Sequence, residues 1–498
     1  MTAEPPFLLA IDQGTTSTRA IAFDSTMRPV ASHAMELRQI YPENGWVEHD
    51  PEDIWRAAVA CCRIAMEGMP AAKIAALGIT NQRETAVLWD RTTGEALHNA
   101  IVWQDRRTAH RCRQLKEAGA EATVTARTGL LLDPYFSATK IEWLLDNIPG
   151  ARERAARGEL AFGTIDSWLI YKLTGGRVHA TDVTNASRTM LLDLKSLAWS
   201  DDMISLFQIP RQLLPEIRNN ADGFGTAIED VLGVPIPIRG VVGDQQGALF
   251  GQGCFAPGDV KCTYGTGCFA LVNTGAAAPP SRNRLLTTCG YRVNGETAYA
   301  MEGSIFVAGA VVQWLRDALG CIRSASEVEA LARTAKPADG LYFVPAFTGL
   351  GAPYWQAEAR GGIVGLTRDA GSAEIARAAL DAVCYQTRDL LGAMRSDMAT
   401  IGLGALAALK VDGGMVKNDW FCQRLADLTG LPVDRPLVTE TTALGAAYLA
   451  GLGTGLFSNL RDIAAGWALD RRFEPELAPA TREALYEGWA KAVSRVRL

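Results

Sequence analysis

The chain has 498 residues, 48% of them hydrophobic, with a formal net charge of -6 and a sequence pI near 5.6. This length exceeds what one ordinary hydrophobic core holds, so two or more large domains are expected. The acidic balance argues against a nucleic-acid partner. Because no secretory signal and no apolar run of about 18 residues is found, we expect a cytoplasmic protein without membrane insertion.

Residues 8–24 predict a β-hairpin, in which two apolar runs flank a polar turn. Asp12 ends the first run, and the turn that follows contains Gly14, Thr15, Thr16, Ser17 and Thr18, with Arg19 next. Such a turn is equally consistent with an inert surface hairpin and with a phosphate-binding loop. In the second case its N–H groups and hydroxyls would surround the anion, and the carboxylate would hold a metal ion.

The rest of the first half alternates strands and helices, which predicts an α/β domain. The expected order is a strand at 29–37, a helix from 51, a strand at 74–80, a hairpin at 86–103, helices over 108–172 and a strand at 238–242. Asp244 stands at the end of this last strand and begins a helix. By itself it is as consistent with a helix N-cap as with a ligand-facing carboxylate. We place the domain boundary just after it, giving domains 1–250 and 251–498.

The second half repeats the opening plan, with a strand at 259–263, a turn at 264–267 and a returning strand at 268–273. Strands at 285–292, 297–302 and 408–411 and helices at 305–319, 373–394, 418–428 and 443–450 follow. Two halves that open alike suggest duplication of one α/β module. That pattern predicts a cleft in which a turn from each half holds a nucleotide phosphate chain.

Other nucleotide and metal motifs are absent or weak. No Gly-x-x-x-x-Gly-Lys-Ser/Thr occurs, and His110-Arg111 is followed by Cys112 rather than by the Asp of protein kinases. Gly451 to Gly455 follows a helix and opens no βαβ unit, so it is interpreted as a helix C-cap and turn. The ten cysteines contain no Cys-x-x-Cys pair, and the five histidines no His-Glu-x-x-His set.

Several segments resemble the glycerol kinases of the FGGY carbohydrate kinase family, which belongs to the actin/Hsp70-like ATPase superfamily. They are IDQGTTSTR (11–19), ITNQRETAVLWDRTTG (79–94), YFSATKIEWLLDN (135–147), GDQQGALFGQ (243–252), TYGTGCFALVNTG (263–275), GLTRDAGSAEIARAALDAVCYQTRDLL (365–391) and VDGGMVKN (411–418). The resemblance spans residues 7 to about 470. It implies an α/β fold of two duplicated ribonuclease H-like domains with a central nucleotide cleft.

By the same resemblance, the chain phosphorylates glycerol to sn-glycerol 3-phosphate with ATP and Mg²⁺. Asp244 would be the general base, and Arg19 the cation near the transferred phosphoryl group. Glycerol would be bound by Arg83, Glu84, Trp103, Tyr135, Asp244, Gln245 and Phe269. The phosphates would contact Gly14, Thr15, Thr16, Ser17, Thr266 and Gly267, the adenosine Gly309, Gln313, Gly414 and Asn418, and the metal Asp12 and Asp244. A homodimer or homotetramer is expected.

Two other functions stay open from the sequence. One is a kinase of the same fold that acts on another polyol or a ketose, which the adjacent Arg83 and Glu84 argue against without excluding it. The other is an actin-like or chaperone-like ATPase switch without a small-molecule acceptor. The absence of a chaperone-type substrate domain weighs against that switch.

Overall fold

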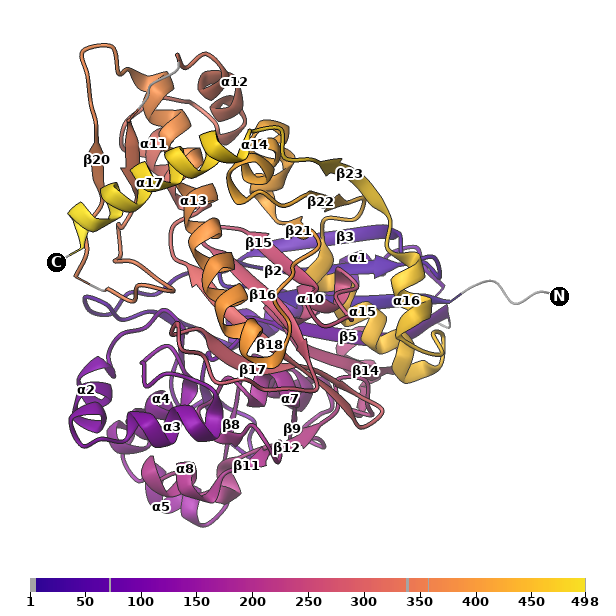
Figure 1. The fold of residues 1–498 in the computed structure, drawn as a ribbon. Helices are drawn as coiled ribbons and strands as arrows, with labels where there is room; N and C mark the ends of the chain where they lie inside the picture. The colour runs from indigo at the N-terminus through magenta and orange to yellow at the C-terminus, as the bar shows by residue number, and fades with distance from the viewer. Residues whose placement is uncertain (1–5, 71–72, 337–339, 357, 498) are drawn as a thin grey trace. The chain divides into compact units, whose positions relative to one another are not determined.

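The structure is a computed structural model that describes residues 6–70, 73–336, 340–356 and 358–497 (Figure 1). The chain forms two compact units: unit 1 is Met1–Phe255, Thr287–Ala300 and Thr441–Trp467, and unit 2 is Ala256–Leu286, Met301–Glu440 and Ala468–Leu498. Both units therefore combine segments that are far apart in the sequence. The predicted boundary after residue 250 divides the chain into two continuous sequence modules rather than into these units, and it stays a prediction.

A six-stranded sheet forms the centre of unit 1. Its order is β13 (Thr226–Ala227), β14 (Ile236–Gly243), β5 (Ile74–Asn81), β1 (Phe7–Gln13), β2 (Ser17–Phe23) and β3 (Pro29–Glu36). Strands β14, β5 and β1 are parallel, whereas β2 and β3 run antiparallel to their neighbours. The predicted opening hairpin is thus β1 and β2.

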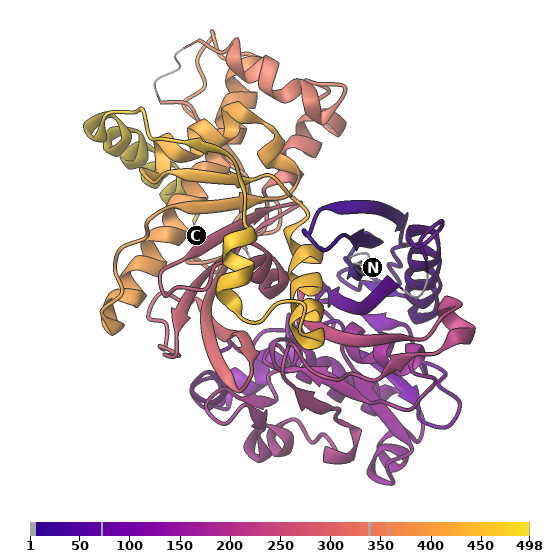
Figure 2. The same ribbon diagram turned by 90° about the vertical axis from the view of Figure 1, so that its right-hand side faces the viewer.

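Helices cover both faces of this sheet. On one face, α1 (Pro51–Ala65) contributes Ile54, Ala58 and Cys61 to a core that contains Leu9 of β1 and Leu77 of β5. On the other face lies α15 (Thr441–Thr454), which belongs to the yellow end of the chain but packs beside the indigo strands (Figures 1 and 2).

The contacts of α15 are close enough to require glycine. A Cβ on Gly78 of β5 would lie 2.3 Å from the carbonyl oxygen of Ala446, and one on Gly445 would lie 2.0 Å from that of Gly247. Gly247 is in α10 (Asp244–Gly251), so the backbones of α10 and α15 touch directly. This contact fixes the helix that begins with Asp244.

Replacing Gly445 by alanine should therefore destabilise unit 1. The new methyl group must push α10 and α15 apart, and overpacking of this kind costs about 2 kcal/mol or more. The matched control is Gly392→Ala in α13 (Ser372–Met398), where an added Cβ meets nothing within 4 Å. That change should stabilise its helix by about 0.5–1 kcal/mol. Denaturant unfolding of both variants is the measurement, and a Gly445→Ala variant as stable as the parent would contradict the packing described.

Four short strand pairs and further helices complete unit 1. The pairs are β4 (Glu48–His49) with β7 (Ala100–Ile101), β6 (Val87–Asp90) with β8 (Leu160–Gly163), β9 (Ala180–Asp182) with β12 (Glu216–Arg218), and β10 (Leu192–Asp193) with β11 (Ala198–Trp199). The helices are α2 (Ala109–Glu117), α3 (Glu121–Thr128), α4 (Ser137–Asn147), α5 (Ala151–Ala156), α6 (Ile165–Leu173), α7 (Val183–Ala186), α8 (Asp201–Leu206), η2 (Arg211–Leu213), α9 (Glu229–Leu232) and α16 (Leu460–Gly466).

A second sheet repeats the first. Its order is β17 (Leu286–Val293), β18 (Glu296–Ile305), β16 (Cys268–Gly275), β15 (Val260–Tyr264), β21 (Leu409–Asp412), β22 (Val433–Pro436) and β23 (Leu469–Phe473). Strands β15, β21 and β22 are parallel and β16 is antiparallel to β15, which matches the arrangement of β1, β5, β14 and β2. The predicted α/β class with a duplicated sheet is confirmed.

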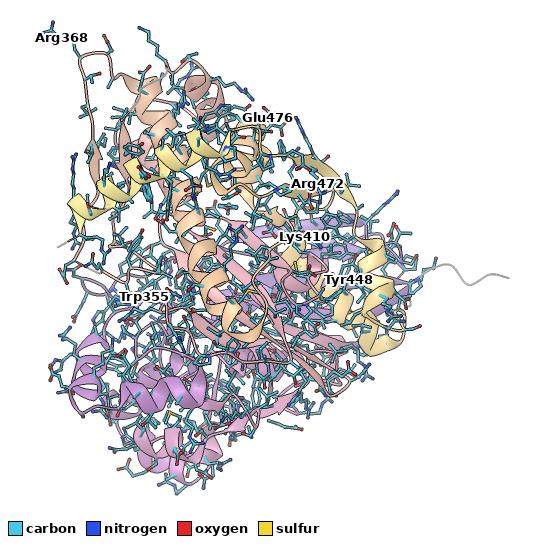
Figure 3. The ribbon with its side chains drawn as sticks, viewed as in Figure 1. Trp355, Arg368, Lys410, Tyr448, Arg472 and Glu476 are labelled. Atoms are coloured by element: carbon cyan, nitrogen blue, oxygen red, sulfur yellow. The ribbon has the colours of Figure 1, made fainter. Side chains whose placement is uncertain are left out.

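The remaining elements of unit 2 lie outside this sheet, and several of them contact α13. They are α11 (Gly309–Asp317), η3 (Ala325–Glu327), α12 (Val328–Arg333), β19 (Tyr342–Val344), β20 (Gly362–Val364), η4 (Ala399–Ile401), η5 (Gly414–Lys417), α14 (Asp419–Thr429) and α17 (Pro479–Val496). At the rim, Arg472 of β23 (Figure 3) donates to both carboxylate oxygens of Asp434 at 2.7 and 2.8 Å. This pair ties β23 to β22.

Some element boundaries differ from the predicted ones. The helix expected at 305–319 begins only at Gly309, because Ile305 still belongs to β18. The helix expected at 443–450 is α15, which runs through Gly451 and Gly453 to Thr454, so the turn predicted from Gly451 starts at Gly455, whose φ is +77°. Strand β8 lies inside the stretch predicted as helical. Much of the hairpin predicted at 86–103 consists of isolated bridges, since β6 pairs with β8 instead.

In the described part of the chain, no helix combines the length and the apolar character that crossing a membrane requires.

Candidate active site

The candidate site lies where three parallel strands of unit 1 end. Asp12 of β1 and Val242 of β14 both stand opposite Thr80 of β5 in the strand register, so the carboxyl ends of the three strands coincide. The segments that follow them carry Arg83 and Asp244. Crevices at the carboxyl ends of parallel strands are where α/β proteins bind ligands, and this is the edge at which the predicted catalytic residues converge.

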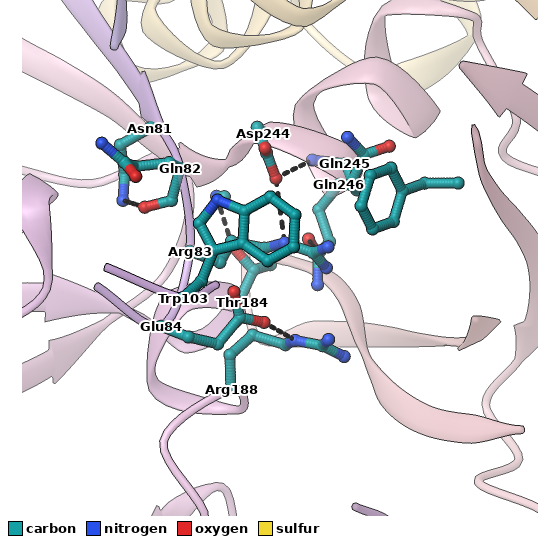
Figure 4. Close-up of polar contacts among 12 residues, drawn as sticks. Asn81, Gln82, Arg83, Glu84, Trp103, Thr184, Arg188, Asp244, Gln245 and Gln246 are labelled. Atoms are coloured by element: carbon teal, nitrogen blue, oxygen red, sulfur yellow. Dashed lines mark hydrogen bonds and ion pairs between the residues drawn. The ribbon is translucent and has the colours of Figure 1, made fainter. Parts of the chain in front are cut away.

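Arg83 and Asp244 form an ion pair at this edge (Figure 4). Arg83 Nε lies 2.9 Å from Asp244 Oδ1, and its NH1 donates to Gln246 Oε1 at 3.2 Å. The Arg83 side chain is 2% exposed, whereas that of Asp244 is 27% exposed. Asp244 Oδ1 also accepts from the N–H of Gln245 at 2.6 Å. The carboxylate is therefore oriented by fixed donors while part of it remains accessible.

Glu84 follows Arg83 but points to a different partner. Its φ is +62°, in the left-handed region that residues with a Cβ seldom adopt. Ser137 Oγ donates to its carbonyl oxygen at 3.0 Å. Its carboxylate accepts from Arg188 Nε at 2.6 Å, and the two side chains are 2% and 0% exposed. The unusual backbone turn thus lets two adjacent charged residues have different partners.

Two aromatic side chains stand beside these charged groups. The rings of Trp103 and Tyr135 meet edge to face with centroids 5.5 Å apart. Trp103 Nε1 donates to Thr15 Oγ1 at 2.8 Å, which links this wall to the β1–β2 turn. Apolar ring faces beside fixed polar groups suit a small polyol, which has a carbon edge and several hydroxyls.

Lys140 holds the backbone of the turn that carries Tyr135. Its ammonium donates to the carbonyl oxygens of Pro134, Tyr135 and Phe136 at 2.7, 2.6 and 3.1 Å, and the residue is fully buried. Burial lowers the pKa of Lys140 to about 8, an effect that the negative charges of Glu84, Asp105 and Asp133 partly oppose. The turn that carries Tyr135 therefore depends on a proton that leaves near pH 8.

We expect the KM for the acceptor substrate to rise as the pH passes through about 8. Below that pH the ammonium supplies three donors, and above it the neutral amine supplies only two, so the effect grows toward alkaline pH. The increase should be about 5- to 10-fold, the equivalent of one hydrogen bond. In Lys140→Met, KM should be high at every pH and lack this step. A pH series of kcat and KM for both proteins tests this, and an unchanged step in Lys140→Met would contradict it.

The first hairpin has a polar network beneath its turn. Gln82 Nε2 lies within 3.3 Å of the carbonyl oxygen of Gly14 and 3.2 Å of His49 Nδ1, and His49 Nε2 lies 2.9 Å from Gln39 Oε1. Gln39 in turn donates to the carbonyl oxygen of Thr15 at 2.8 Å. Burial lowers the pKa of His49 to about 4, so the ring is neutral at pH 7 and has one donor and one acceptor. The network holds the turn through the carbonyl oxygens of Gly14 and Thr15.

The turn itself is open at its tip. Thr16 is exposed, Gly14, Thr15 and Ser17 are partly exposed, and the Gly14 N–H bonds the Ser17 carbonyl at 2.9 Å. Asp12 and Arg19 face each other across the two strands in register, and both are partly exposed. All six residues predicted for phosphate, metal and transition-state charge in this hairpin thus lie together.

The second hairpin belongs to unit 2 and contacts the start of α11. The carbonyl oxygen of Thr266 accepts from the N–H groups of Ala308 and Ala310, both at 3.0 Å, and that of Gly265 accepts from Gly309 at 2.9 Å. A Cβ on Gly267 would lie 2.7 Å from the carbonyl oxygen of Ile305. Thr266, Gly267 and Gly309 are therefore brought together.

The other residues predicted for adenosine and glycerol in unit 2 are also placed. Gln313 and Gly414 are exposed, and a Cβ on Gly414 would meet nothing within 4 Å. Asn418 is the N-cap of α14, where its Oδ1 accepts from the Phe421 N–H at 2.8 Å. Phe269 is half-buried on β16 opposite Thr263. The ligand contacts of these four residues stay predictions.

The donor set at the strand ends fits Mg²⁺. Asp12 lies on β1 and Asp244 directly follows β14, and these two strands flank β5, so they are about 10 Å apart at the usual strand spacing. Within the ranges that the structure describes, no group of three or more His, Cys, Asp or Glu side chains could hold a metal ion. Mg²⁺ typically takes one or two carboxylates and completes its shell with phosphate oxygens and water, which these two residues allow.

The sequence interpretation missed several residues that hold the site. They are Arg188, Lys140, Gln246 and Ser137, of which the last three lie within the family-like segments 135–147 and 243–252. Gln246 is fully buried and connects Arg83 to the Cys289 carbonyl. For Arg188, a charged residue two positions before the apolar run Met190–Leu192 was the available signal, since buried charges are usually paired.

Comparison with known proteins identifies the family to which this chain belongs. The N-terminal domain model of the FGGY family of carbohydrate kinases matches residues 7–251, and the C-terminal domain model matches residues 260–454. The chain belongs to this family. Among proteins similar to this FGGY family member, a glycerol kinase of Methylobacterium nodulans is 60% identical over 98% of the chain and 97% of that protein. Glycerol kinase 1 of Pseudomonas aeruginosa is 58% identical over 99% of both chains. The solved structure of Plasmodium falciparum glycerol kinase with ADP has a TM-score of 0.92 at 37% identity, covering 99% of each chain.

Proposed function

We propose that this chain transfers the γ-phosphoryl group of ATP to glycerol and forms sn-glycerol 3-phosphate. The observation that carries the proposal is the pairing of Arg83 with Asp244 beside Glu84, at the carboxyl ends of β5 and β14. The relatives named glycerol kinase, at 58–60% identity over nearly the whole chain, support the choice of glycerol.

In the proposed reaction, Asp244 accepts the proton of the attacking hydroxyl. Arg83 and the N–H of Gln245 hold its carboxylate in one orientation, and 27% of the side chain stays exposed to receive a substrate. A weak base is sufficient, because phosphoryl transfer passes through a loose transition state in which little proton transfer is needed early. The hydroxyl oxygen attacks the γ-phosphorus in line with the leaving β-phosphate oxygen, so the bond to ADP breaks as the bond to glycerol forms.

Glycerol has three hydroxyls, and the proposed site offers a separate group for each. Arg83 and Gln245 donate, whereas Glu84 and Asp244 accept, and the phenol of Tyr135 can do either. Trp103, and by resemblance Phe269, would cover the carbon edge. A substrate that lacks one hydroxyl would leave a buried group unpaired, so discrimination should be strong.

The two hairpins would bind the nucleotide phosphates, with Arg19 stabilising the charge of the transferred group. Gly309, Gln313, Gly414 and Asn418 would contact the adenosine. Bound by Asp12 and Asp244, Mg²⁺ would neutralise phosphate charge. A cytoplasmic location and a homodimer or homotetramer also stay predictions.

The alternative is a kinase of the same fold that acts on another polyol or a ketose. A coupled ADP-release assay with glycerol, dihydroxyacetone, erythritol, ribulose and xylulose separates the two. The proposal predicts the highest kcat/KM for glycerol. A higher kcat/KM for a pentulose or for erythritol would overturn the substrate, and ADP release at an equal rate without any acceptor would favour an ATPase switch.

A further inference from the structure

Glu84 is a buried carboxylate whose orientation decides how it can meet a substrate hydroxyl. We propose that Arg188 is the positioning residue that sets this orientation, and that it thereby determines which hydroxyl the site recognises. The inference rests on the proposed function, because it concerns the group that would accept from glycerol.

The contact between the two side chains is short and shielded from water. Arg188 Nε donates to Glu84 Oε1 at 2.6 Å, and the side chains are 0% and 2% exposed (Figure 4). Charge-assisted hydrogen bonds of this kind are stronger and more directional than neutral ones. A carboxylate has about four acceptor positions, so Glu84 can bind Arg188 and still accept from a substrate hydroxyl.

The position of Arg188 is fixed, because the segment before it is held by several hydrogen bonds. Asp182 caps α7 and accepts from Asn185 Nδ2 at 2.7 Å, while Asn185 and Asn81 exchange side-chain hydrogen bonds at 3.0 Å. Thr184 Oγ1 accepts from the N–H of Gly243, next to Asp244, at 2.9 Å. The segment that carries Arg188 is thus fixed to the ends of β5 and β14, the same strands that position Glu84 and Asp244.

The same guanidinium also approaches the aromatic wall. Its Cζ lies 5.5 Å from the ring centre of Tyr135 and 5.3 Å from that of Phe136, within the range of cation–π attraction. Lys140 fixes the backbone of this turn, and the cation–π contact with Arg188 then holds the Tyr135 ring relative to Glu84. One arginine therefore connects two of the predicted glycerol ligands.

Lysine at position 188 separates positioning from charge. It keeps the positive charge that a buried carboxylate needs, but replaces a planar, directional donor with a compact ammonium on a flexible stem. The test compares the KM for glycerol with the inhibition constants of propane-1,2-diol and propane-1,3-diol, each of which lacks one glycerol hydroxyl. In Arg188→Lys, the KM for glycerol should rise by about 30-fold or more. The diol that lacks the hydroxyl recognised by Glu84 should keep its inhibition constant within about twofold, since it never used that carboxylate.

Arg107→Lys is the matched control. The Arg107 side chain is also 0% exposed and pairs with Glu48 at 2.7 Å and Asp105 at 2.9 Å, away from Glu84. This variant should lower Tm without changing the ratio of glycerol to diol binding. If Arg188→Lys weakens glycerol and both diols in parallel, or leaves all three unchanged, the positioning role is wrong.

A second comparison covers the case in which Arg188→Lys does not fold. Glu84→Gln and Glu84→Gln/Arg188→Gln remove one charge and then the pair, so the double variant buries no unpaired charge. Equal glycerol-to-diol ratios in the two variants support a role through Glu84, and a further loss in the double variant contradicts it. A parent chain that does not phosphorylate glycerol would overturn the proposed function itself, whereas an active parent with parallel changes overturns only the role of Arg188.

Discussion

Asp244→Asn is expected to lower kcat by about 10²- to 10⁴-fold while the KM for ATP stays within about twofold. Asparagine keeps the shape of the side chain and can still accept from Arg83 Nε, which lies 2.9 Å from Asp244 Oδ1. It cannot take the proton of the attacking hydroxyl, and it offers Mg²⁺ a weaker ligand. Because asparagine is nearly the same size as aspartate, α10 should still begin at this residue and pack closely on α15, and the fold should not change.

The control for this variant is Asp201→Asn. Asp201 has an 86% exposed side chain paired with Arg211 on the surface of unit 1, so its replacement should leave kcat unchanged. Steady-state kinetics and thermal unfolding of both variants are the measurements. If Asp244→Asn folds normally and retains a kcat near that of the parent, Asp244 is not the base.

Arg83→Gln should reduce kcat/KM for glycerol by about 10²- to 10³-fold, with KM and kcat both affected. Arg83 is almost completely buried and contacts Asp244 and Gln246 at once, so its loss frees the carboxylate to rotate and leaves the Gln246 oxygen without this donor. The positive charge next to the attacking hydroxyl is lost as well. The KM for ATP should change little.

A double variant identifies the cause of this loss. If Arg83 acts by orienting Asp244, then Arg83→Gln/Asp244→Asn should be little worse than Asp244→Asn alone. Fully additive losses would show that Arg83 acts independently of Asp244. Arg152→Gln, which removes a surface pair with Asp146, is the matched control and should behave like the parent.

Local patterns in the sequence were sufficient for the elements that carry the site. Apolar runs around Gly14 and Gly265 predicted both hairpins, and the apolar strand before Gly243 placed Asp244 at a strand end. The repeated opening also predicted the duplicated sheet. These features depend on residues that are close together in the chain, where alternation and turn residues are informative.

The supporting contacts could not be predicted in the same way. Glu84 and Arg188 are separated by 104 residues, and no local pattern links them. The left-handed backbone of Glu84 contradicts the usual preference of a residue with a Cβ, and it is held by a local turn, in which the Thr85 N–H donates to the Arg83 carbonyl at 2.7 Å, together with the tertiary hydrogen bond from Ser137. The return of α15 to the first sheet is equally non-local, since it follows from the glycines that allow the close contact.

The most direct test of the account is to identify the phosphorylated product by ³¹P NMR, with ATP, Mg²⁺ and glycerol as the only reactants. We expect one new phosphomonoester, on a primary oxygen of glycerol, to accumulate in equal amount with ADP. Inorganic phosphate formed at the same rate with and without glycerol would contradict the account, because it would mean that the site built from Arg83, Glu84 and Asp244 does not present a polyol to ATP.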